Sequence, residues 1–282
     1  MKQWYLKQKL NNQKNINFIL GDVRDKERLN SVLRNKIDYV FHAAATKIVP
    51  TSEFNPEECI KTNILGAMNV IDCSKINKIK RVIALSTDKA SSPINLYGAT
   101  KLCSDKLFVA QNYTNNFTKF AVVRYGNVIA SRGSIIPFFQ SLKKEKYFPI
   151  THPDMTRFFV SIEDAVKFSA FGMTKMKGGE IFVKKIKSIN ILDLARSIKN
   201  NAKFKFTGIR PGEKIHEQMI GSDESMNTLE FINHYEILND LNKNIKNSKP
   251  GSKIVKKNFV FSSETSKKFT INEFSKLIKK NC

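Results

Sequence analysis

The chain has 282 residues, 41% of them hydrophobic, which suits one large domain or a domain with a smaller lobe. No apolar run approaches the roughly 18 residues of a membrane helix, and the polar, basic stretch MKQWYLKQKLNNQKNINF does not resemble a signal peptide. The formal net charge of +23 suits an anionic substrate, but the lysines are spread out and no nucleic-acid-binding motif is visible. We therefore expect neither a nucleic-acid partner nor a membrane.

Apolar runs alternate with helical patterns in the first half of the chain. Strands are predicted over residues 15–23, 37–45, 81–87 and 119–129, and helices over 25–35, 55–76 and 96–113. Pro56 falls in the first turn of the second helix. Strands that are apolar throughout and separated by helices indicate a parallel sheet covered on both faces. The expected fold is therefore α/β, a doubly wound, Rossmann-like sheet that binds ligands at the carboxyl ends of its strands.

The alternation ends after Gly133, where shorter segments follow. We expect residues 1–134 to form the main, dinucleotide-binding domain. Residues 135–282 are expected to form mainly a smaller α+β substrate-binding lobe, with some segments returning to the main domain.

The cysteines and histidines give no metal pattern. With no export signal, we expect reduced thiols in the cytoplasm. His216 and Glu217 begin an H-E-x-x-H pattern, but Ile220 stands where the second histidine is needed, so we interpret His216 as a helix residue. The cysteines, whose spacing is neither paired nor metal-like, are Cys59, Cys73, Cys103 and Cys282.

The segment ALSTDKASSPINLYGATK, residues 84–101, places four reactive side chains after one predicted strand. Tyr97 and Lys101 are four residues apart and share one helix face. A nearby ammonium lowers a tyrosine pKa from about 10, so Tyr97 is a candidate base towards a sugar or alcohol hydroxyl. The alternatives are an ordinary surface pair on the helix and, for Asp88 and Lys89, a surface turn with one ionic contact.

Thr-Asp-Lys at a strand end, Tyr-x-x-x-Lys on the next helix and RYGNV on the following strand together resemble the extended short-chain dehydrogenase/reductase family. GDVRD, HAAATKIVP, ECIKTNILGAMNVI, MTRFFVSIEDAV and GIRPGEKIHEQMI narrow the resemblance. They are similar to the soluble, C5-inverting UDP-N-acetylglucosamine 4,6-dehydratases of the pseudaminic-acid type. The resemblance covers nearly the whole chain. Its most specific element is Asp-Lys, because related retaining dehydratases carry Asp-Glu there and simple epimerases carry neither.

The resemblance implies a role for each residue of the central motif. Tyr97, helped by Lys101, would take the C4 hydroxyl proton while hydride leaves C4 for a nicotinamide cofactor, and hydride would later return to C6. Lys89, as a neutral amine with a lowered pKa, would remove the C5 proton. Asp88, with a pKa raised by burial, would protonate the departing C6 hydroxyl. Thr87 would hydrogen-bond the C4 oxygen.

The resemblance also implies binding residues for NADP or NAD and for a UDP-N-acetylhexosamine. Each has a plainer alternative: helix capping for Asp22, tight packing for the alanines and surface salt bridges for the arginines. The cofactor residues, besides Tyr97 and Lys101, are Asp22, Val23, Ala43, Ala44, Ala45 and Asn63. The substrate residues are Lys47, Asn127, Arg132, Gly133, Ser134, Arg157, Arg210 and Glu213.

One departure from the family pattern is the absence of a Gly-x-x-Gly-x-x-Gly turn, whose backbone amides would face the cofactor pyrophosphate. About one βαβ unit, roughly 30 or more residues, is then missing. We therefore expect an N-terminally truncated domain over 1–134, poor stability, weak cofactor binding and little activity. An alternative function is a non-catalytic relic or subunit that binds nucleotide sugar or an intact partner. A homo-oligomer is expected, with the two long helices pairing across a two-fold axis.

Overall fold

The computed structural model describes residues 2–10, 13, 15–114, 117–239 and 250–281. Its largest sheet has seven strands in the order β1-β2-β3-β7-β12-β11-β13, of which the first four are parallel and the last three join by antiparallel pairing. The doubly wound α/β fold is confirmed. In the order of the sheet, the strands are Tyr39–His42, Arg81–Thr87, Lys119–Tyr125, Ile181–Lys184, His234–Ile237, Thr228–Glu230 and Lys253–Ile254.

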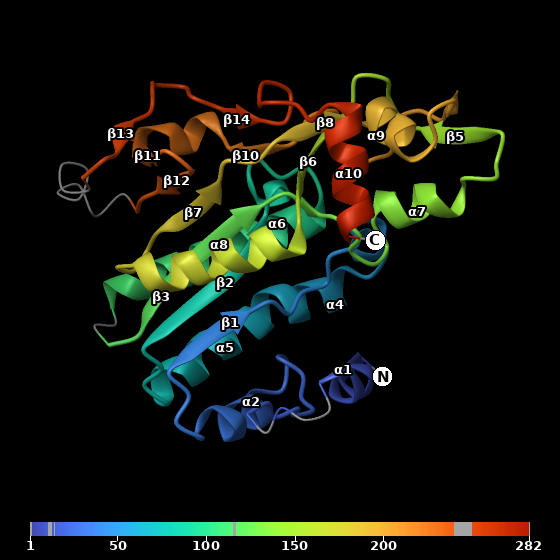
Figure 1. Cartoon of the computed structure of the whole chain (residues 1–282). Helices are drawn as coiled ribbons and strands as arrows, with labels where there is room; N and C mark the ends of the chain where they lie inside the picture. The colour runs from blue at the N-terminus through green and yellow to red at the C-terminus, as the bar shows by residue number, and fades with distance from the viewer. Residues whose placement is uncertain (1, 11–12, 14, 115–116, 240–249, 282) are drawn as a thin grey trace.

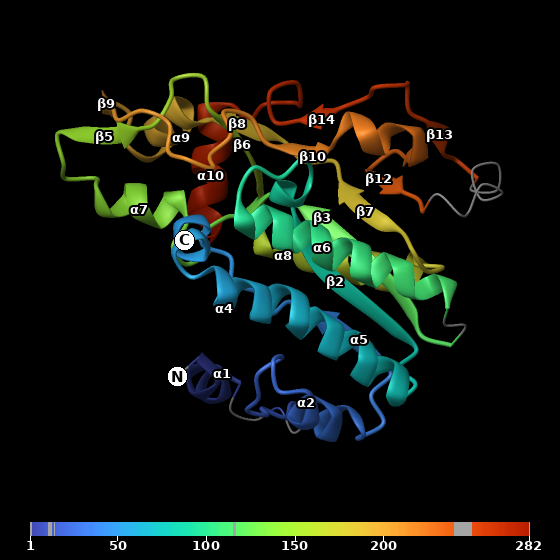
Figure 2. The ribbon, with the colours of Figure 1, turned by 180° about the vertical axis from the view of Figure 1, so that it is seen from behind.

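Helices cover both faces of this sheet. α8 (Ile162–Lys175) lies on one face, and α6 (Leu96–Ala110) lies on the other, with the helix that contains α4 and α5 beyond it (Figures 1 and 2). Alternate residues of β2 point to opposite sides: Val82 joins the core under α6, and Ile83 joins the core under α8. This two-sided burial is why the strand is apolar throughout.

The long helix predicted over 55–76 is confirmed, with Pro56 at its first position. It consists of α4 (Pro56–Ile60), a π-helical turn (Lys61–Leu65) and α5 (Gly66–Ile76). The helix predicted over 25–35 is α2 (Lys26–Leu33), capped by Asp25, whose side chain accepts a hydrogen bond from the Arg28 amide.

The strand predicted over residues 15–23 is wrong. These residues follow α1 (Lys2–Lys9) and form no strand, and the side chain of Leu20 is exposed. The physical reason is the lack of a partner. Among the described residues, β1 pairs with β2 on one side, and no strand pairs with its other edge. An extended segment without a ladder gains no backbone hydrogen bonds, whatever its apolar pattern.

A second core lies away from the large sheet. It gathers Phe139, Phe148, Phe159 and Phe274. The strands β7, β11, β12 and β13 pair within the large sheet, and the division of the chain into domains at residues 134 and 135 stays a prediction. No helix among the described residues has the length and apolar character to cross a bilayer. The other helices and strands of the described residues are α3 (Val49–Phe54), β4 (Asn127–Val128), α7 (Ile135–Ser141), β5 (Tyr147–Ile150), β6 (Thr156–Val160), β8 (Ser188–Asn190), α9 (Ile191–Ile198), β9 (Lys203–Phe206), β10 (Gln218–Ile220), β14 (Phe261–Ser262) and α10 (Ile271–Asn281), besides short 3₁₀ turns.

Candidate active site

The carboxyl end of β2 turns directly into a short 3₁₀ helix, Asp88–Ala90, that carries the acid and the amine. Thr87 Oγ1 donates to Asp88 Oδ1 at 3.0 Å, and Lys89 Nζ donates to the same oxygen at 3.1 Å. Gly98 of α6 packs against this turn so closely that a Cβ there would lie 2.3 Å from the Lys89 carbonyl oxygen. The glycine therefore lets the helix approach the turn.

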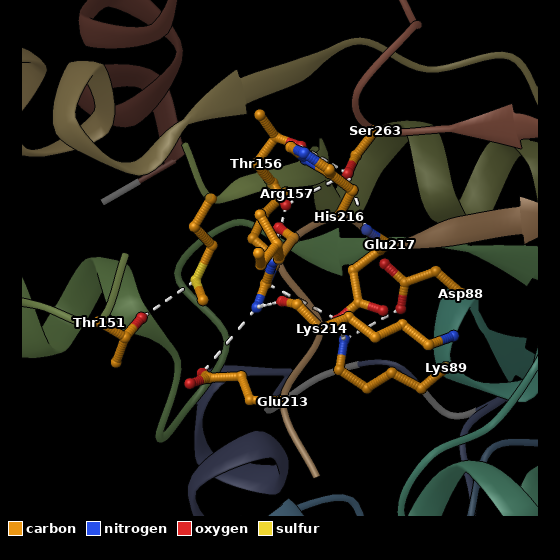
Figure 3. Close-up of polar contacts among 12 residues, drawn as sticks. Asp88, Lys89, Thr151, Thr156, Arg157, Glu213, Lys214, His216, Glu217 and Ser263 are labelled. Carbon is orange, nitrogen blue, oxygen red and sulfur yellow. Dashed lines mark hydrogen bonds and ion pairs between the residues drawn. The ribbon is translucent and has the colours of Figure 1, made fainter. Parts of the chain in front are cut away.

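A third charged group, which the sequence reading missed, completes this cluster. Glu217 Oε1 lies 3.1 Å from Lys89 Nζ, and the Glu217 side chain is 3% exposed. Asp88 and Glu217 thus contact one ammonium from two separate parts of the chain (Figure 3). We call Asp88, Lys89 and Glu217 the charged trio.

The interpretation of His216 as a helix residue is wrong. His216 forms an isolated parallel bridge with Thr156, and its Nδ1 lies 2.8 Å from Thr156 Oγ1 (Figure 3). Pairing with β6 holds this segment extended and brings the next residue, Glu217, to Lys89. Among the described residues, no group of three or more His, Cys, Asp or Glu side chains could hold a metal ion.

The contacts within the charged trio shift the pKa values of its members in different directions. Burial raises the pKa of Asp88, and the nearby Glu217 carboxylate adds to this effect. Burial also opposes ionisation of Glu217, but Lys89 and Arg157 outweigh it and lower the pKa of Glu217. For Lys89, burial favours the neutral amine, yet the two carboxylates prevail and raise its pKa. The raised pKa of Asp88 agrees with expectation, whereas the expected lowering of the Lys89 pKa is wrong because Glu217 was not foreseen.

Tyr97 and Lys101 lie on α6, as predicted, and both are buried. Burial raises the pKa of Tyr97 to about 12, so the expected lowering is wrong: desolvation of the phenolate outweighs the attraction of the nearby Lys89 ammonium. Burial lowers the pKa of Lys101, whose Nζ donates to the Leu85 carbonyl at 2.8 Å. Behind it, Asp105 accepts from Ser86 Oγ at 2.7 Å and completes a buried polar layer.

Asn63, in the π-helical turn, ties three segments together. Its amide donates to the Thr46 carbonyl and to Thr100 Oγ1, both at 3.0 Å, and its carbonyl accepts from the Thr46 amide at 2.8 Å. These contacts fix the segment after β1, where Ala43, Ala44 and Ala45 are exposed. Asn63 therefore braces this strand end.

The residues present fit one end of a nicotinamide cofactor. Lys101 makes one hydrogen bond among the described residues, so two of its three ammonium donors remain for a ligand such as a ribose. Asp22 instead pairs with Arg24 at 2.8 Å, which lowers the Asp22 pKa, and Val23 packs against Gly66. The sequence offers no Gly-x-x-Gly-x-x-Gly turn for the pyrophosphate, so the fit covers the nicotinamide and its ribose.

A pocket of about 690 Å³ opens beside the charged trio. Ser134 Oγ, at the start of α7, is buried there without a hydrogen-bond partner among the described residues. Lys47 and Arg132 stand outside the lining, where Lys47 Nζ donates to the Arg132 carbonyl at 3.0 Å. The predicted site residues that line the pocket are Lys89, Asn127, Gly133, Ser134, Arg157, Arg210 and Glu213.

The two arginines of the pocket differ in what they contact. Arg157 is buried, and its terminal nitrogens donate to the carbonyls of Thr156, Lys214 and Ile215 at 2.7 to 2.9 Å. Arg210 is exposed and pairs with Glu213 at 2.7 Å. Arg210 is thus the arginine whose guanidinium remains accessible to a ligand.

A doubly wound sheet with a Tyr-x-x-x-Lys helix and reactive groups at the carboxyl end of a parallel strand, here β2, is the arrangement of the extended short-chain dehydrogenase/reductases. More narrowly, the chain belongs to the polysaccharide biosynthesis protein family, whose sequence profile matches residues 1–239.

Three relatives illustrate the similarity. The chain is 57% identical over 224 residues to a UDP-N-acetylglucosamine 4,6-dehydratase (inverting) of Campylobacter jejuni serotype O:2, covering 78% of this chain and 67% of the relative. It is 44% identical over 235 residues to a UDP-glucose 4-epimerase of Rickettsia bellii, covering 81% and 68%. The crystal structure of Pen from Bacillus thuringiensis superimposes with a TM-score of 0.90 at 35% identity, covering 99% of this chain and 86% of Pen.

Proposed function

We propose that this chain is a nucleotide-sugar 4,6-dehydratase that acts on UDP-N-acetylglucosamine, inverts C5 and uses NADP or NAD. The observation that carries the proposal is the buried Asp88–Lys89 pair at the end of β2, with Lys89 lining the pocket. The similarity to the inverting dehydratase of Campylobacter jejuni supports the same reading. The product would feed surface-polysaccharide or protein glycosylation.

The first step needs a base for the C4 hydroxyl. Tyr97 takes this proton, and Thr87, whose hydroxyl contacts Asp88, binds the C4 oxygen. Because burial raises the Tyr97 pKa, the phenolate forms only as the reaction needs it, and the nearby Lys89 ammonium attracts it. Lys101, four residues further along the same face of α6, would assist. When bound, a nicotinamide cofactor held by Tyr97 and Lys101 would supply the redox chemistry: hydride would leave C4 and later return to C6, with a proton added to C5 from the opposite face.

The second step divides two protons between neighbouring side chains. Lys89, as the amine, takes the proton from C5, and the electron pair of that C–H bond moves towards the C4 carbonyl. Asp88, as the carboxylic acid, gives a proton to the C6 oxygen as the C6–O bond breaks and water leaves. The amine and the acid arise together when the Lys89 ammonium passes one proton across the 3.1 Å contact to Asp88. The raised pKa of Asp88 favours that transfer.

The remaining predicted residues bind the two ligands in this proposal. Lys101 and Tyr97 hold the nicotinamide ribose, the small side chains Ala43 and Ala44 let the cofactor pass close to the strand end, and Asp22 and Val23 lie at the adenine. Arg210 meets the diphosphate as a planar donor of two hydrogen bonds. The others bind the nucleotide sugar: Lys47, Asn127, Arg132, Gly133, Ser134, Arg157 and Glu213.

The test is to incubate the protein with UDP-N-acetylglucosamine and NADP or NAD and to identify the product by mass spectrometry and NMR. The proposal predicts a 4-keto-6-deoxy sugar that has lost one water, with no net reduction of cofactor and with C5 inverted. A C4 epimer that retains the water would assign the chain instead to the activity named for its Rickettsia bellii relative. Binding of the nucleotide sugar without turnover would support the non-catalytic alternative.

We also propose a homo-oligomer in the cytoplasm. The helix formed by α4 and α5 exposes Ile60, Leu65, Met68 and Ile76, which suit packing against a second copy. Light scattering should then give a mass of two chains or more, and Met68→Glu should reduce it towards one. Free Cys59 and Cys73 fit a reducing compartment.

A further inference from the structure

Glu217 is the one member of the charged trio that the proposed reaction does not use. Its side chain is nonetheless buried and its backbone is held by hydrogen bonds. Its side chain is 3% exposed, and its backbone is held on both sides by Ser263: the Glu217 amide donates to Ser263 Oγ at 2.9 Å, and the Ser263 amide donates to the Glu217 carbonyl at 2.8 Å. A carboxylate is costly to bury without a partner. We therefore expect the buried Glu217 carboxylate to have a partner charge and a role.

Two cations face this carboxylate from different elements. Lys89 Nζ lies 3.1 Å from Glu217 Oε1, and Arg157 Nε lies 3.7 Å from the same oxygen. Hydrogen bonds to the carbonyls of Lys214 and Ile215 hold the Arg157 guanidinium in place at the wall of the pocket. It therefore fixes Glu217 against Lys89 (Figure 3).

We propose that Glu217, fixed by Arg157, is a positioning residue and the buried counter-ion of Lys89. It stabilises the ammonium that forms as Lys89 takes the C5 proton, and it leaves Asp88 free to hold the proton that the C6 hydroxyl receives. This role rests on the proposed dehydratase reaction, whereas the charge contact itself exists without substrate.

The physical argument is that two carboxylates cannot share one ammonium equally in a buried site. Like charges repel, so one acid keeps its proton more readily than the other. Arg157 contacts Glu217 and not Asp88, so Glu217 is the carboxylate that stays ionised. Asp88 Oδ2 and Glu217 Oε2 are both buried without a partner among the described residues, so the contact with Arg157 is what distinguishes the two carboxylates. The charged and titratable groups that face Lys89 are Asp88, Tyr97, Arg157, Lys214 and Glu217.

The first test measures the Lys89 amine directly, without substrate or cofactor. The wild-type protein and Glu217→Gln are acetylated with trace acetic anhydride across a pH series, and labelling at Lys89 is quantified by peptide mass spectrometry. Lys89 lines the pocket, so the reagent reaches it. Loss of the counter-ion should raise the labelling rate at a fixed pH at least tenfold, which is one pH unit in the titration. An unchanged rate would overturn the proposal.

Matched variants separate charge from structure. Glu217→Asp keeps the charge and should restore most of the wild-type labelling rate. Glu264→Gln removes an exposed carboxylate 3.8 Å from His216 and should leave Lys89 labelling within twofold of wild type. If Glu264→Gln changes the rate as much as Glu217→Gln does, the effect is general and the proposal is wrong. Cooperative thermal unfolding of each variant confirms that the folded protein is being labelled.

Turnover gives the second readout. In Glu217→Gln the low-pH limb of kcat should move at least one unit lower, and the plateau should fall because a weaker base takes the C5 proton more slowly. KM should stay within a few-fold of wild type. A fall in kcat without a shift of the low-pH limb of its pH profile would show a merely structural role and contradict the proposal. If no form dehydrates the sugar but labelling still shifts, the counter-ion stands and the proposed function fails.

Discussion

The region formed by β2, β3 and α6 differs from the neighbouring strand β1 in what it buries. On the α6 side of β2 and β3, Arg124 is fully buried and pairs with Asp105 at 3.3 Å and with Glu224 at 2.9 Å. Strand β1, by contrast, is an edge of the sheet among the described residues, and its Tyr39 and Phe41 side chains are half exposed.

The difference indicates which part of the sheet contributes most to the stability of the fold. The β2–β3–α6 region encloses charges so completely that each one depends on its partners. The β1 edge carries charges only as surface pairs, such as Lys80 with Asp38 at 2.8 Å, and leaves a pocket of about 1080 Å³ beside Ile37. Changes near β2 should therefore cost much more than equivalent changes near β1.

The largest expected effect is on turnover. Lys89→Ala removes the base at the end of β2 and should lower kcat by about 10³–10⁴-fold. The matched control is Lys26→Ala on α2, which breaks a surface pair with Asp72 at 2.6 Å and should leave kcat unchanged. Steady-state product formation measures both. Near-normal turnover of Lys89→Ala would show that Lys89 is not the catalytic base.

Two phenylalanines on either side of β2 compare the packing directly. Phe120 of β3 is fully buried, and Phe120→Ala should lower the free energy of unfolding by about 3–5 kcal/mol. Phe41 of β1 is 50% exposed, and Phe41→Ala should cost about 1 kcal/mol or less. Urea unfolding followed by circular dichroism gives both values. Equal costs would mean that β1 is as deeply packed in solution as β3.

Two aspartates compare the buried and surface charges. Asp105→Asn leaves Arg124 with Glu224 as its one remaining carboxylate partner and should cost about 3 kcal/mol of stability. Asp38→Asn breaks the exposed pair with Lys80 and should cost less than about 1 kcal/mol. If thermal and urea unfolding rank these variants the other way, the buried network does not hold the fold.

The smallest effect, taken over a single pH unit, concerns acid. Burial lowers the pKa of His42, at the end of β1, to about 3, against about 6.5 in the unfolded chain. The unfolded state therefore binds the proton first, and this contribution is full above pH 6.5 and lost as pH falls towards 3. Wild type should lose about 1.4 kcal/mol more per pH unit than His42→Gln across that range. Parallel stability curves would show that His42 titrates freely in the folded protein.

The sequence was sufficient where local pattern and final burial agree. The strand at 81–87, the helix at 55–76 and the Asp88–Lys89 and Tyr97–Lys101 pairs all follow from periodicity and spacing along one segment. The strand predicted at 15–23 failed because a strand also needs a neighbour, which no local pattern supplies.

The charges of the site needed contacts that lie far apart in the chain. Glu217 reaches Lys89 from 128 residues along the sequence, through the pairing of His216 with Thr156, and it adds to the effect of Asp88 in raising the Lys89 pKa. The Tyr97 pKa likewise depends on how much solvent the whole fold excludes. In the sequence this segment stood out through the motif GIRPGEKIHEQMI and through the His216–Glu217 pair, which we interpreted as part of a helix, and neither indicated a counter-ion.

The central claim is that Lys89 takes the C5 proton and Asp88 protonates the C6 hydroxyl. Its most direct test follows deuterium at C5 and loss of the C6 hydroxyl by NMR, in deuterium oxide with UDP-N-acetylglucosamine and NADP. Wild type should place deuterium at C5 and release water. Asp88→Asn should still exchange C5, because loss of this carboxylate lowers the Lys89 pKa and the ammonium can give its proton to solvent, while most of the dehydration is lost; Lys89→Ala should do neither. Deuterium entering C5 at the wild-type rate in Lys89→Ala would contradict the account.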